Sequence, residues 1–325
     1  MAAILEVRNL QVAYSSRSGQ ETRALGGVSF SLEAGEILGV LGESGSGKSS
    51  LAAALLGLLP AHGRIEGGSV RFEGNELLGA KEDALRGLRG ARIALIPQES
   101  GLSLHPALRV REQVSDVLRA HRGGSGGPVR EKTETVLRSV FGNEAARIGA
   151  SYPHELSGGQ RQRVLVAQAV ACEPAVIVAD EPTASLDPAT QNEILKLFGR
   201  LHGELGAALV LITHSPALLA GFAHRIVVLY AGQVAECGPA DEVLARPQHP
   251  YTKALLDCLP EWPATHPART RLNVIAGDPP DMTAPPRGCR FEPRCPERME
   301  GCAAREPSAR QLGEGHSASC FKFGG

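Results

Sequence analysis

The stretch GESGSGKS at residues 42–49 decides the fold, because it satisfies every fixed position of the phosphate-binding pattern GxxxxGK[ST]. An apolar run before it, EILGVL at 36–41, predicts a buried strand, and SSLAAALLGLL at 49–59 predicts a helix after it. The glycines let the backbone turn with its N–H groups pointing inward, towards the positive end of that helix. The pattern therefore predicts a site for a nucleoside triphosphate. The alternative is a glycine-rich turn that binds nothing.

The motif also assigns roles to the residues of the loop. Lys48 is expected to reach the β- and γ-phosphates, and Ser49 to ligate Mg²⁺. The residues expected to contact the nucleotide are Gly42, Glu43, Ser44, Gly45, Ser46, Gly47, Lys48, Ser49 and Ser50.

The composition is that of a globular protein with one large domain and an extension: 325 residues, 42% of them hydrophobic. A net charge of -1 and a pI near 6.8 provide no basic surface for nucleic acid, which is therefore not an expected partner. The N-terminus MAAILEVRNL has no signal-peptide pattern, and no apolar run approaches the roughly 20 residues that cross a bilayer. We expect a cytosolic chain that cannot form a membrane pore by itself.

The order of elements along the chain predicts an α/β fold. Residues 4–33 alternate between apolar and polar types, which predicts a small layer of antiparallel strands. Buried strands separated by helical stretches predict a mainly parallel sheet, and they are expected at 36–41, 92–96, 175–179, 208–212 and 225–230.

Two further segments differ from this alternation. Amphipathic stretches between Gln98 and Ser157 predict an inserted helical subdomain, with a flexible loop at HRGGSGGP, residues 121–128. After Gly238 the composition shifts towards proline, arginine and cysteine, which predicts a loop-rich extension at 246–325.

Two adjacent carboxylates end one of the predicted strands, in AVIVADEP at 175–182. The carboxyl edge of an open α/β sheet is where ligands bind. Asp180 is placed to hold Mg²⁺ through water, and Glu181 is the candidate general base for a water that attacks the γ-phosphate. An acidic turn after a strand is the alternative.

The stretch LSGGQRQRV at 156–164 precedes another helical run. Ser157 and the two glycines after it would offer N–H groups to a phosphate, and Ser157 would also cap the helix. Taken alone, Ser-Gly-Gly is also common in ordinary loops.

Taken together and in this order, these motifs resemble the nucleotide-binding subunit of ABC transporters over residues 1–245. The matching stretches are GESGSGKS, LSGGQ, VIVADE, SLD at 185–187 and the histidine after ALVLIT. The resemblance implies a P-loop NTPase with a RecA-like core, an antiparallel β layer and a helical subdomain at about 99–160, followed by an extension at 246–325. It also implies ATP and Mg²⁺ as the ligands.

The same resemblance implies roles for single residues. Tyr14 would stack on adenine, Gln98 would sense Mg²⁺ and the γ-phosphate while contacting the membrane subunit, and His214 would act as a γ-phosphate switch. The implied catalytic residues are Glu181, His214 and Lys48, and the implied Mg²⁺ ligands are Ser49, Gln98 and Asp180. The ATP of a partner subunit would be met by Ser157, Gly158, Gly159, Gln160 and Asp187. The alternatives are a core-covering tyrosine, a surface glutamine and a helix-capping histidine.

Three longer stretches look like the dipeptide, oligopeptide and nickel importers: QESGLSLHPALRV at 98–110, YPHELSGGQRQRV at 152–164 and HPYTKALL at 249–256. The resemblance continues through GCRFEPRCP at 288–296, which favours peptides over nickel. It implies a peripheral ATPase at the cytoplasmic face of the cell (inner) membrane that powers peptide uptake as a head-to-tail dimer. The implied partners are a second, paralogous ATPase chain, two transmembrane permease subunits and an extracytoplasmic substrate-binding protein.

Other functions remain open on the sequence. One is a nickel importer, and another is a soluble ABC ATPase of a non-transport machine, such as the carbon-phosphorus lyase accessory ATPases. A metal-binding regulatory module that holds ATP is a third alternative.

Four of the seven cysteines gather near the end of the chain, at Cys289, Cys295, Cys302 and Cys320. Their spacing is not the CxxC of a zinc ribbon, but four thiols in one short segment of a cytosolic chain favour a common metal centre. The peptide-importer resemblance implies an iron-sulfur cluster of the [4Fe-4S] type. Zinc and no metal at all are the alternatives.

Overall fold

The computed structural model describes residues 3–98, 103–123, 126–258 and 273–324. The chain folds into two compact units, each of which is built from segments that are distant in sequence. The first unit contains Glu33–Glu36 and Gly79–Ile212, and the second contains Ala3–Leu32, Ile37–Leu78 and Thr213–Gly325. The phosphate loop and the C-terminal segment therefore belong to the same unit.

An antiparallel layer opens the second unit, as the alternating sequence predicts. Its strands β1 (Ala3–Ser15), β2 (Glu21–Glu33), β4 (Gly63–Phe72) and β5 (Asn75–Glu76) are ordered β2-β1-β4-β5. Strand β1 pairs with β4, for example Val7 with Val70. The sequence did not predict β4, because its stretch GRIEGGSVRF carries three glycines, which are rare in strands.

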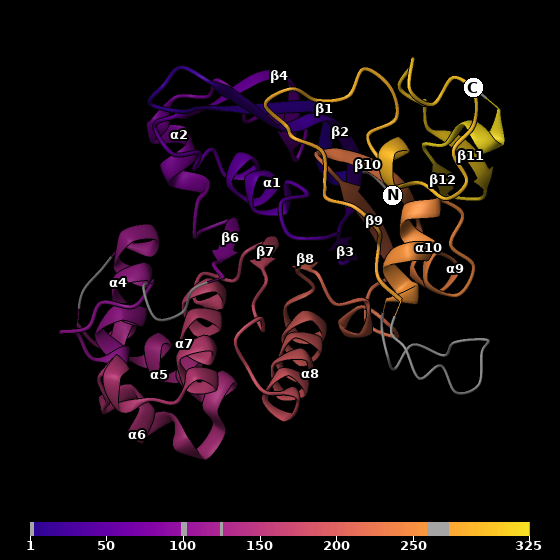
Figure 1. Cartoon of the computed structure of the whole chain (residues 1–325). Coiled ribbons are helices and arrows are strands. Elements are labelled where there is room, and N and C mark those ends of the chain that lie inside the picture. The colour runs from indigo at the N-terminus through magenta and orange to yellow at the C-terminus, as the bar shows by residue number, and fades with distance from the viewer. Residues whose placement is uncertain (1–2, 99–102, 124–125, 259–272, 325) are drawn as a thin grey trace. The chain divides into compact units, whose positions relative to one another are not determined.

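A second sheet follows in the same unit, and it contains both expected and unexpected strands. Its order is β11 (Arg310–Gly313), β12 (His316–Ala318), β10 (Gln233–Pro239), β9 (Arg225–Tyr230) and β3 (Ile37–Leu41). Strands β3 and β9 are parallel, and β10 is antiparallel to β9. The C-terminal segment is thereby hydrogen-bonded to the sheet that begins next to the phosphate loop (Figure 1).

Three short helices complete the second unit. Helix α1 (Lys48–Leu55) begins at the end of the phosphate loop, and α9 (Ala240–Ala245) and α10 (Pro250–Asp257) follow β10. Beyond these, the C-terminal residues 273–324 carry two single 3-10 turns and the short strands β11 and β12.

The first unit contains three parallel strands, β8 (Ala208–Thr213), β7 (Val176–Asp180) and β6 (Ile93–Ile96), in that order. All residues of β7 and β8 are buried, which explains their continuous apolar sequences. Helices α2 (Glu82–Leu88) and α8 (Pro188–Leu205) belong to the same unit.

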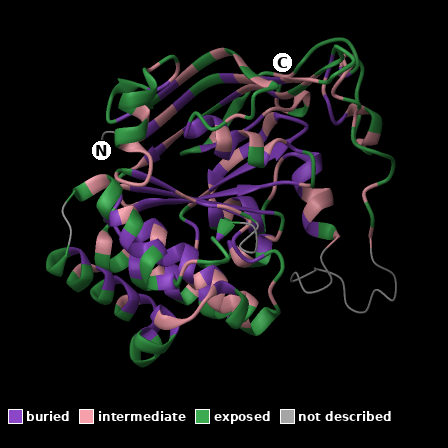
Figure 2. Ribbon diagram, turned by 90° about the vertical axis from the view of Figure 1, so that its left-hand side faces the viewer, coloured by how far each residue is buried: buried purple, intermediate pink, exposed green. Residues whose placement is uncertain are grey.

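Four further helices of the first unit lie together in Figure 1: α4 (Val110–Arg122), α5 (Gly127–Phe141), α6 (Ala145–Ala150) and α7 (Gly158–Val170). In α4 the buried residues Val110, Val114 and Leu118 recur at every fourth position, which is the amphipathic pattern that the sequence showed. Figure 2 shows the same division into buried inner faces and exposed outer faces.

The flexible loop predicted at 121–128 is shorter than expected. Arg122 ends α4, and Gly127 begins α5 with Pro128 in its first turn, because proline tolerates that position. Residues 124–125 of this loop, and residues 99–102 at the predicted start of the subdomain, lie outside the described residues. Within the described ranges, no helix is long and apolar enough to span a bilayer.

Candidate functional site

The phosphate loop joins β3 to α1 in the second unit, and its shape depends on glycine. Gly45 and Gly47 have φ angles of 78° and 102°, in the left-handed region that disfavours other residues. A Cβ atom on Gly47 would lie 2.6 Å from the carbonyl oxygen of Ala24. Glycine is therefore required at residue 47 for both backbone conformation and space.

Lys48 lies inside this loop and is only 5% exposed. Its Nζ donates hydrogen bonds to the carbonyl oxygens of Gly42, at 2.8 Å, and Glu43, at 2.9 Å. The hydroxyl of Ser46 is buried and has no hydrogen-bond partner among the residues that the structure describes. A buried, unpaired donor beside a lysine fits an anionic phosphate oxygen. Ser44 and Ser49 are exposed.

The structure places Tyr14 at the end of β1, against the beginning of α1. Its hydroxyl donates to the Oγ of Ser50 at 3.2 Å, and its ring centroid lies 5.5 Å from that of His62. An aromatic ring is thus held next to the first turn of the helix that follows the phosphate loop. That Tyr14 stacks on adenine stays a prediction.

The two carboxylates belong to the first unit and follow β7. Asp180 is 8% exposed at the end of the strand. Glu181 has a left-handed φ of 44°, which costs a residue with a side chain roughly 1–2 kcal/mol. Its N–H donates to the carbonyl oxygen of Ile212 at 2.9 Å, which holds this conformation. Such strain is concentrated at functional sites.

Gln98 and Glu181 are brought together although 83 residues separate them in sequence. The Nε2 of Gln98 donates to Oε2 of Glu181 at 3.4 Å. The pairing places a hydrogen-bond donor beside the candidate general base, at the carboxyl edge of the parallel strands of this unit.

The signature stretch LSGGQ forms the N-terminal end of α7, as its sequence predicts. The Oγ of Ser157 accepts from the N–H of Gln160 at 3.2 Å, and the Oε1 of Gln160 accepts from the N–H of Ser157 at 3.1 Å. This reciprocal capping box satisfies two N–H groups at the helix end. Ser157 itself is exposed.

Asp187 caps the neighbouring helix α8 and is also exposed. Its carboxylate accepts from the N–H groups of Ala189 and Thr190, each at 3.1 Å. These hydrogen bonds, with that of the Thr190 hydroxyl foremost, lower the pKa of Asp187. The carboxylate therefore stays charged at the positive end of α8.

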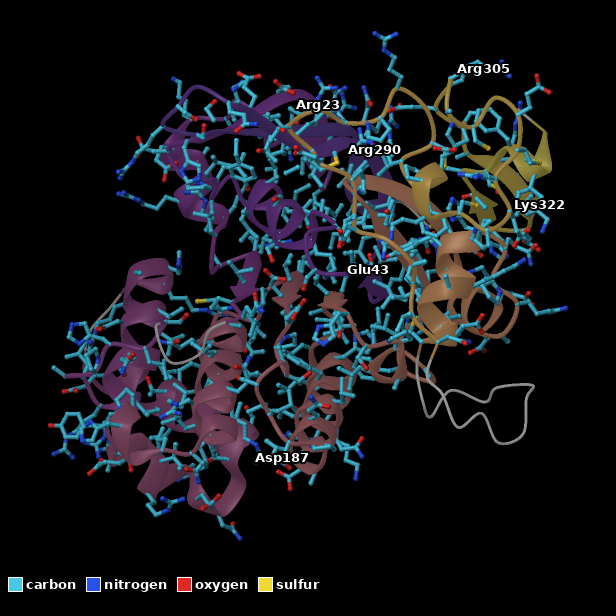
Figure 3. The ribbon with its side chains drawn as sticks, in the orientation of Figure 1. Arg23, Glu43, Asp187, Arg290, Arg305 and Lys322 are labelled. Carbon is cyan, nitrogen blue, oxygen red and sulfur yellow. The ribbon has the colours of Figure 1, made fainter. Side chains whose placement is uncertain are left out.

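Helices α7 and α8 touch at these capped ends. A Cβ atom on Gly159 would lie 2.5 Å from Cγ2 of Thr190, whereas one on Gly158 would meet Leu186 at an ordinary 3.5 Å. The absence of a side chain at residue 159 thus permits the contact. The contact brings together the two segments, the signature stretch and the residues after Asp187, that are predicted to meet a partner subunit; Asp187 is labelled in Figure 3.

His214 follows β8 directly and is exposed. The N–H of Ser215 donates to the Oγ1 of Thr213 at 3.0 Å, which defines the turn that carries the histidine. The predicted residues are therefore divided between the units. Tyr14, Lys48 and His214 belong to the second, and Gln98, Asp180, Glu181 and the signature to the first.

Two residues that contact the phosphate loop, Arg294 and Tyr251, have no signal in the sequence. The carboxylate of Glu43 accepts from Nη1 of Arg294 at 2.8 Å and from Nη2 at 3.3 Å. The N–H of Glu43 donates to the hydroxyl of Tyr251 at 2.9 Å. These partners lie 251 and 208 residues away in sequence, so no local pattern indicates them.

The four C-terminal cysteines are free thiols, with Cys302 buried and the other three half-buried. Desolvation raises the pKa of Cys289 and Cys320, and raises that of Cys295 to about 11; neighbouring thiols add to each rise. Among the described residues, which include all four, no group of three or more His, Cys, Asp or Glu side chains is arranged to hold a metal ion. The predicted iron-sulfur or zinc centre is therefore not shown, because a count of thiols does not determine their geometry.

Comparisons with known proteins agree with this geometry. The ABC transporter family model matches residues 25–184, and the model of the oligopeptide/dipeptide transporter C-terminal region matches residues 235–302. The chain is 42% identical to the oligopeptide transport ATP-binding protein OppD of Escherichia coli, over 98% of its own length and 93% of that protein. It is 40% identical to the dipeptide transport ATP-binding protein DppD of the same organism, over 98% and 96%.

A solved structure of a dimeric ATP-binding cassette, in a post-hydrolysis state with ADP and Pi, is also similar. Its TM-score is 0.64 at 30% sequence identity, and the match covers 73% of this chain and 98% of that one. The similarity includes the fold of the cassette and the C-terminal region. The chain therefore belongs to the ABC transporter ATP-binding proteins, within the group that serves oligopeptide and dipeptide transport.

Proposed function

We propose that this ABC ATPase couples ATP binding and hydrolysis to the uptake of di- or oligopeptides through partner membrane subunits. The observation that carries this proposal is the match to peptide transport proteins over nearly the whole chain, including the C-terminal region at 235–302. A match to the cassette alone would suit many ABC systems. Nickel import and a soluble non-transport machine are not favoured by these relatives.

The proposed site binds ATP through the phosphate loop and Tyr14, with Mg²⁺ held by Ser49, Gln98 and Asp180. Mg²⁺ would neutralise charge on the β- and γ-phosphate oxygens. Glu181 would accept the proton of a water whose oxygen attacks the γ-phosphorus, as the bond from that phosphorus to the β-γ bridging oxygen breaks and ADP leaves. Lys48 would stabilise the γ-phosphate charge, and His214 would contact the same phosphate.

We further propose that two ATPase chains complete each other's ATP sites. The residues that would face the partner's ATP are Ser157, Gly158, Gly159, Gln160 and Asp187. Support comes from the exposed, capped ends of α7 and α8, whose positive N-termini suit phosphate, and from the dimeric state of the solved relative. A single chain would then be a poor ATPase.

The wider assembly is proposed from the relatives' transport names. It consists of a second, paralogous ATPase chain, two transmembrane permeases and an extracytoplasmic substrate-binding protein, with this chain peripheral on the cytoplasmic face of the membrane. Residues 1–245 would form the ATPase domain, with the helical subdomain at about 99–160, and 246–325 the extension.

A metal centre in that extension also remains a proposal. Cys289, Cys295, Cys302 and Cys320 lie near enough to influence one another's pKa, and four thiolates suit iron-sulfur or, alternatively, zinc. Brown protein with absorbance near 400 nm after anaerobic purification, and iron and sulfide in stoichiometric amounts, would support [4Fe-4S]. Stoichiometric zinc in a colourless protein would exclude it.

Reconstitution tests the transport function. The chain is co-purified with its membrane and binding-protein partners, inserted into liposomes, and supplied with labelled dipeptides, longer peptides or Ni²⁺. ATP-dependent accumulation of peptides, lost in the Glu181→Gln variant, is the expected result. Accumulation of Ni²⁺ alone, or co-purification only with soluble proteins, would overturn the proposal.

A further inference from the structure

The C-terminal segment holds the second residue of the phosphate loop, Glu43, by its side chain. The guanidinium of Arg294 donates to both carboxylate oxygens of Glu43, at 2.8 and 3.3 Å. A planar, two-pronged contact of this kind defines both the position and the orientation of the carboxylate. Tyr251 holds the backbone N–H of the same residue at 2.9 Å, so Glu43 is fixed at two atoms.

This ion pair is largely shielded from water. The side chain of Arg294 is 5% exposed and that of Glu43 is 24% exposed. A guanidinium stays protonated in proteins even where burial opposes its charge, and that of Arg294 donates its hydrogen bonds to Glu43 and Tyr230. Nη1 also lies 3.3 Å from the hydroxyl of Tyr230. The Cζ atom of the guanidinium lies over the ring of Tyr230, 5.8 Å from its centroid. The arginine is therefore charged and held in place.

The position of Glu43 gives this pair a consequence for nucleotide binding. Its carbonyl oxygen is one of the two that accept hydrogen bonds from Lys48, so its backbone forms part of the phosphate loop. A carboxylate at this point without a cation would repel the phosphates and compete with them for Lys48. The guanidinium of Arg294 removes this repulsion.

A second arginine of the segment is linked to the loop through the backbone of residues 231 and 232. Nη1 of the buried Arg290 donates to the carbonyl oxygen of Ala231, and the next residue, Gly232, donates its N–H to the carbonyl oxygen of Ser46 at 2.8 Å. A Cβ atom on Gly26 would lie 2.2 Å from Nη2 of Arg290, so glycine makes room for the guanidinium. Figure 3 labels Arg290 and Glu43, with Arg305 at the outer margin of the segment.

We propose that Arg294 is a positioning residue for ATP binding, which acts by neutralising Glu43 and fixing the phosphate loop. The inference rests on the proposed role of GESGSGKS in binding ATP. It makes the C-terminal segment a part of the nucleotide site rather than an appendage of the ATPase domain.

Binding of N-methylanthraniloyl-ATP with Mg²⁺ to the purified full-length chain tests the inference. Arg294→Ala should weaken binding roughly tenfold, because a partly buried carboxylate loses a charged, two-pronged partner beside the phosphates. Arg294→Lys keeps the charge without the fork and should weaken binding about threefold. Arg305→Ala is the matched control: it removes a guanidinium of the same segment, which lies over the ring of Phe321, and should leave the affinity unchanged.

The decisive comparison removes the carboxylate first. In a Glu43→Gln background, Arg294→Ala should change the affinity less than about twofold, since no charge remains to be neutralised. A loss as large as in the wild-type background would show that Arg294 only supports the structure and would overturn the inference. Unchanged binding in both Arg294→Ala and Arg294→Lys would also overturn it.

Two further measurements separate other causes of failure. Thermal unfolding shows whether Arg294→Ala is folded; if it is not, Arg294→Lys in both backgrounds provides the same comparison. Lys48→Ala reports on the proposed function itself. If Lys48→Ala binds the nucleotide as well as wild type does, the ATP assignment of the loop has failed, whatever Arg294 does.

Discussion

Glu236 is the residue whose loss should most weaken the attachment of the C-terminal segment. It lies in β10 and is 0% exposed. Oε1 accepts from the N–H of Gln248 at 2.8 Å and lies 2.8 Å from Nε2 of His316, and Oε2 accepts from the N–H of His249 at 2.9 Å. One carboxylate thus joins β10 to the beginning of α10 and to β12.

The magnitude of a Glu236→Ala change follows from these three contacts. Each donor that is left buried without a partner costs about 1–3 kcal/mol, and relief from desolvating the carboxylate offsets part of the sum. We expect a net loss of about 3–5 kcal/mol, which is the cost of three donors without partners less this relief. Glu236→Gln keeps the volume, but its amide nitrogen must face one donor, so about 2 kcal/mol should be lost.

Urea unfolding of the purified chain without nucleotide measures both losses. Glu242→Gln is the control, because it breaks only an exposed ion pair with Arg246, the residue that caps the C-terminal end of α9. This change should lower the free energy of unfolding by less than about 0.5 kcal/mol. Hydrogen exchange at the amides of Gln248 and His249 should accelerate in Glu236→Ala. A loss below about 1 kcal/mol in that variant would refute the reasoning.

Three other predictions concern separate parts of the molecule. Glu181→Gln should keep ATP bound but reduce phosphate release by the assembled transporter about 10²–10⁴-fold, and wild-type hydrolysis would exclude Glu181 as the base. Gly159→Ala should lower the free energy of unfolding by about 1–3 kcal/mol, because the new Cβ would lie 2.5 Å from the stiff side chain of Thr190. Gly158→Ala should lower it less in the same thermal unfolding experiment, and equal losses in the two variants would contradict this reasoning. Burial lowers the pKa of His249 from 6.5 to about 4. Between these two pH values the unfolded chain binds more protons than the folded chain, so the free energy of unfolding should fall by up to about 3 kcal/mol as the pH drops through this range. His249→Asn, which keeps a helix-capping acceptor, should lose this slope in urea unfolding at pH 7 and 4.5, and an unchanged slope would show that other groups cause it.

The strands that the sequence predicted are those whose signal is local. Strands β3, β7, β8 and β9 are short apolar runs because nearly all of their residues are buried. Such a run of apolar residues can be recognised in the sequence without knowledge of the neighbouring strands. Strands β4, β10, β11 and β12 were not predicted. They contain glycine or proline or are only three or four residues long, so they depend on a partner strand rather than on their own composition.

The candidate site likewise has some features that local sequence predicts and others that depend on distant segments. The helix cap at Ser157 acts within three residues of sequence, so its motif predicts it correctly. The approach of Gly159 to Thr190 and the pairing of Gln98 with Glu181 join distant segments. No periodicity or spacing contains that information.

By itself, the sequence determined that this chain has a phosphate loop, a signature helix and a carboxylate pair in the order typical of one family. Each of these motifs is a short stretch in which the backbone conformation and the helix end require particular residue types. The residues of the motif therefore predict its function. Only the tertiary structure decided that Arg294 contacts the phosphate loop and that Arg290 is linked to it through Ala231 and Gly232. It also decided that the four clustered thiols form no ligand group among the residues described. Such contacts depend on where distant segments are packed, because a charge or a thiol acts on what lies within a few ångströms in space.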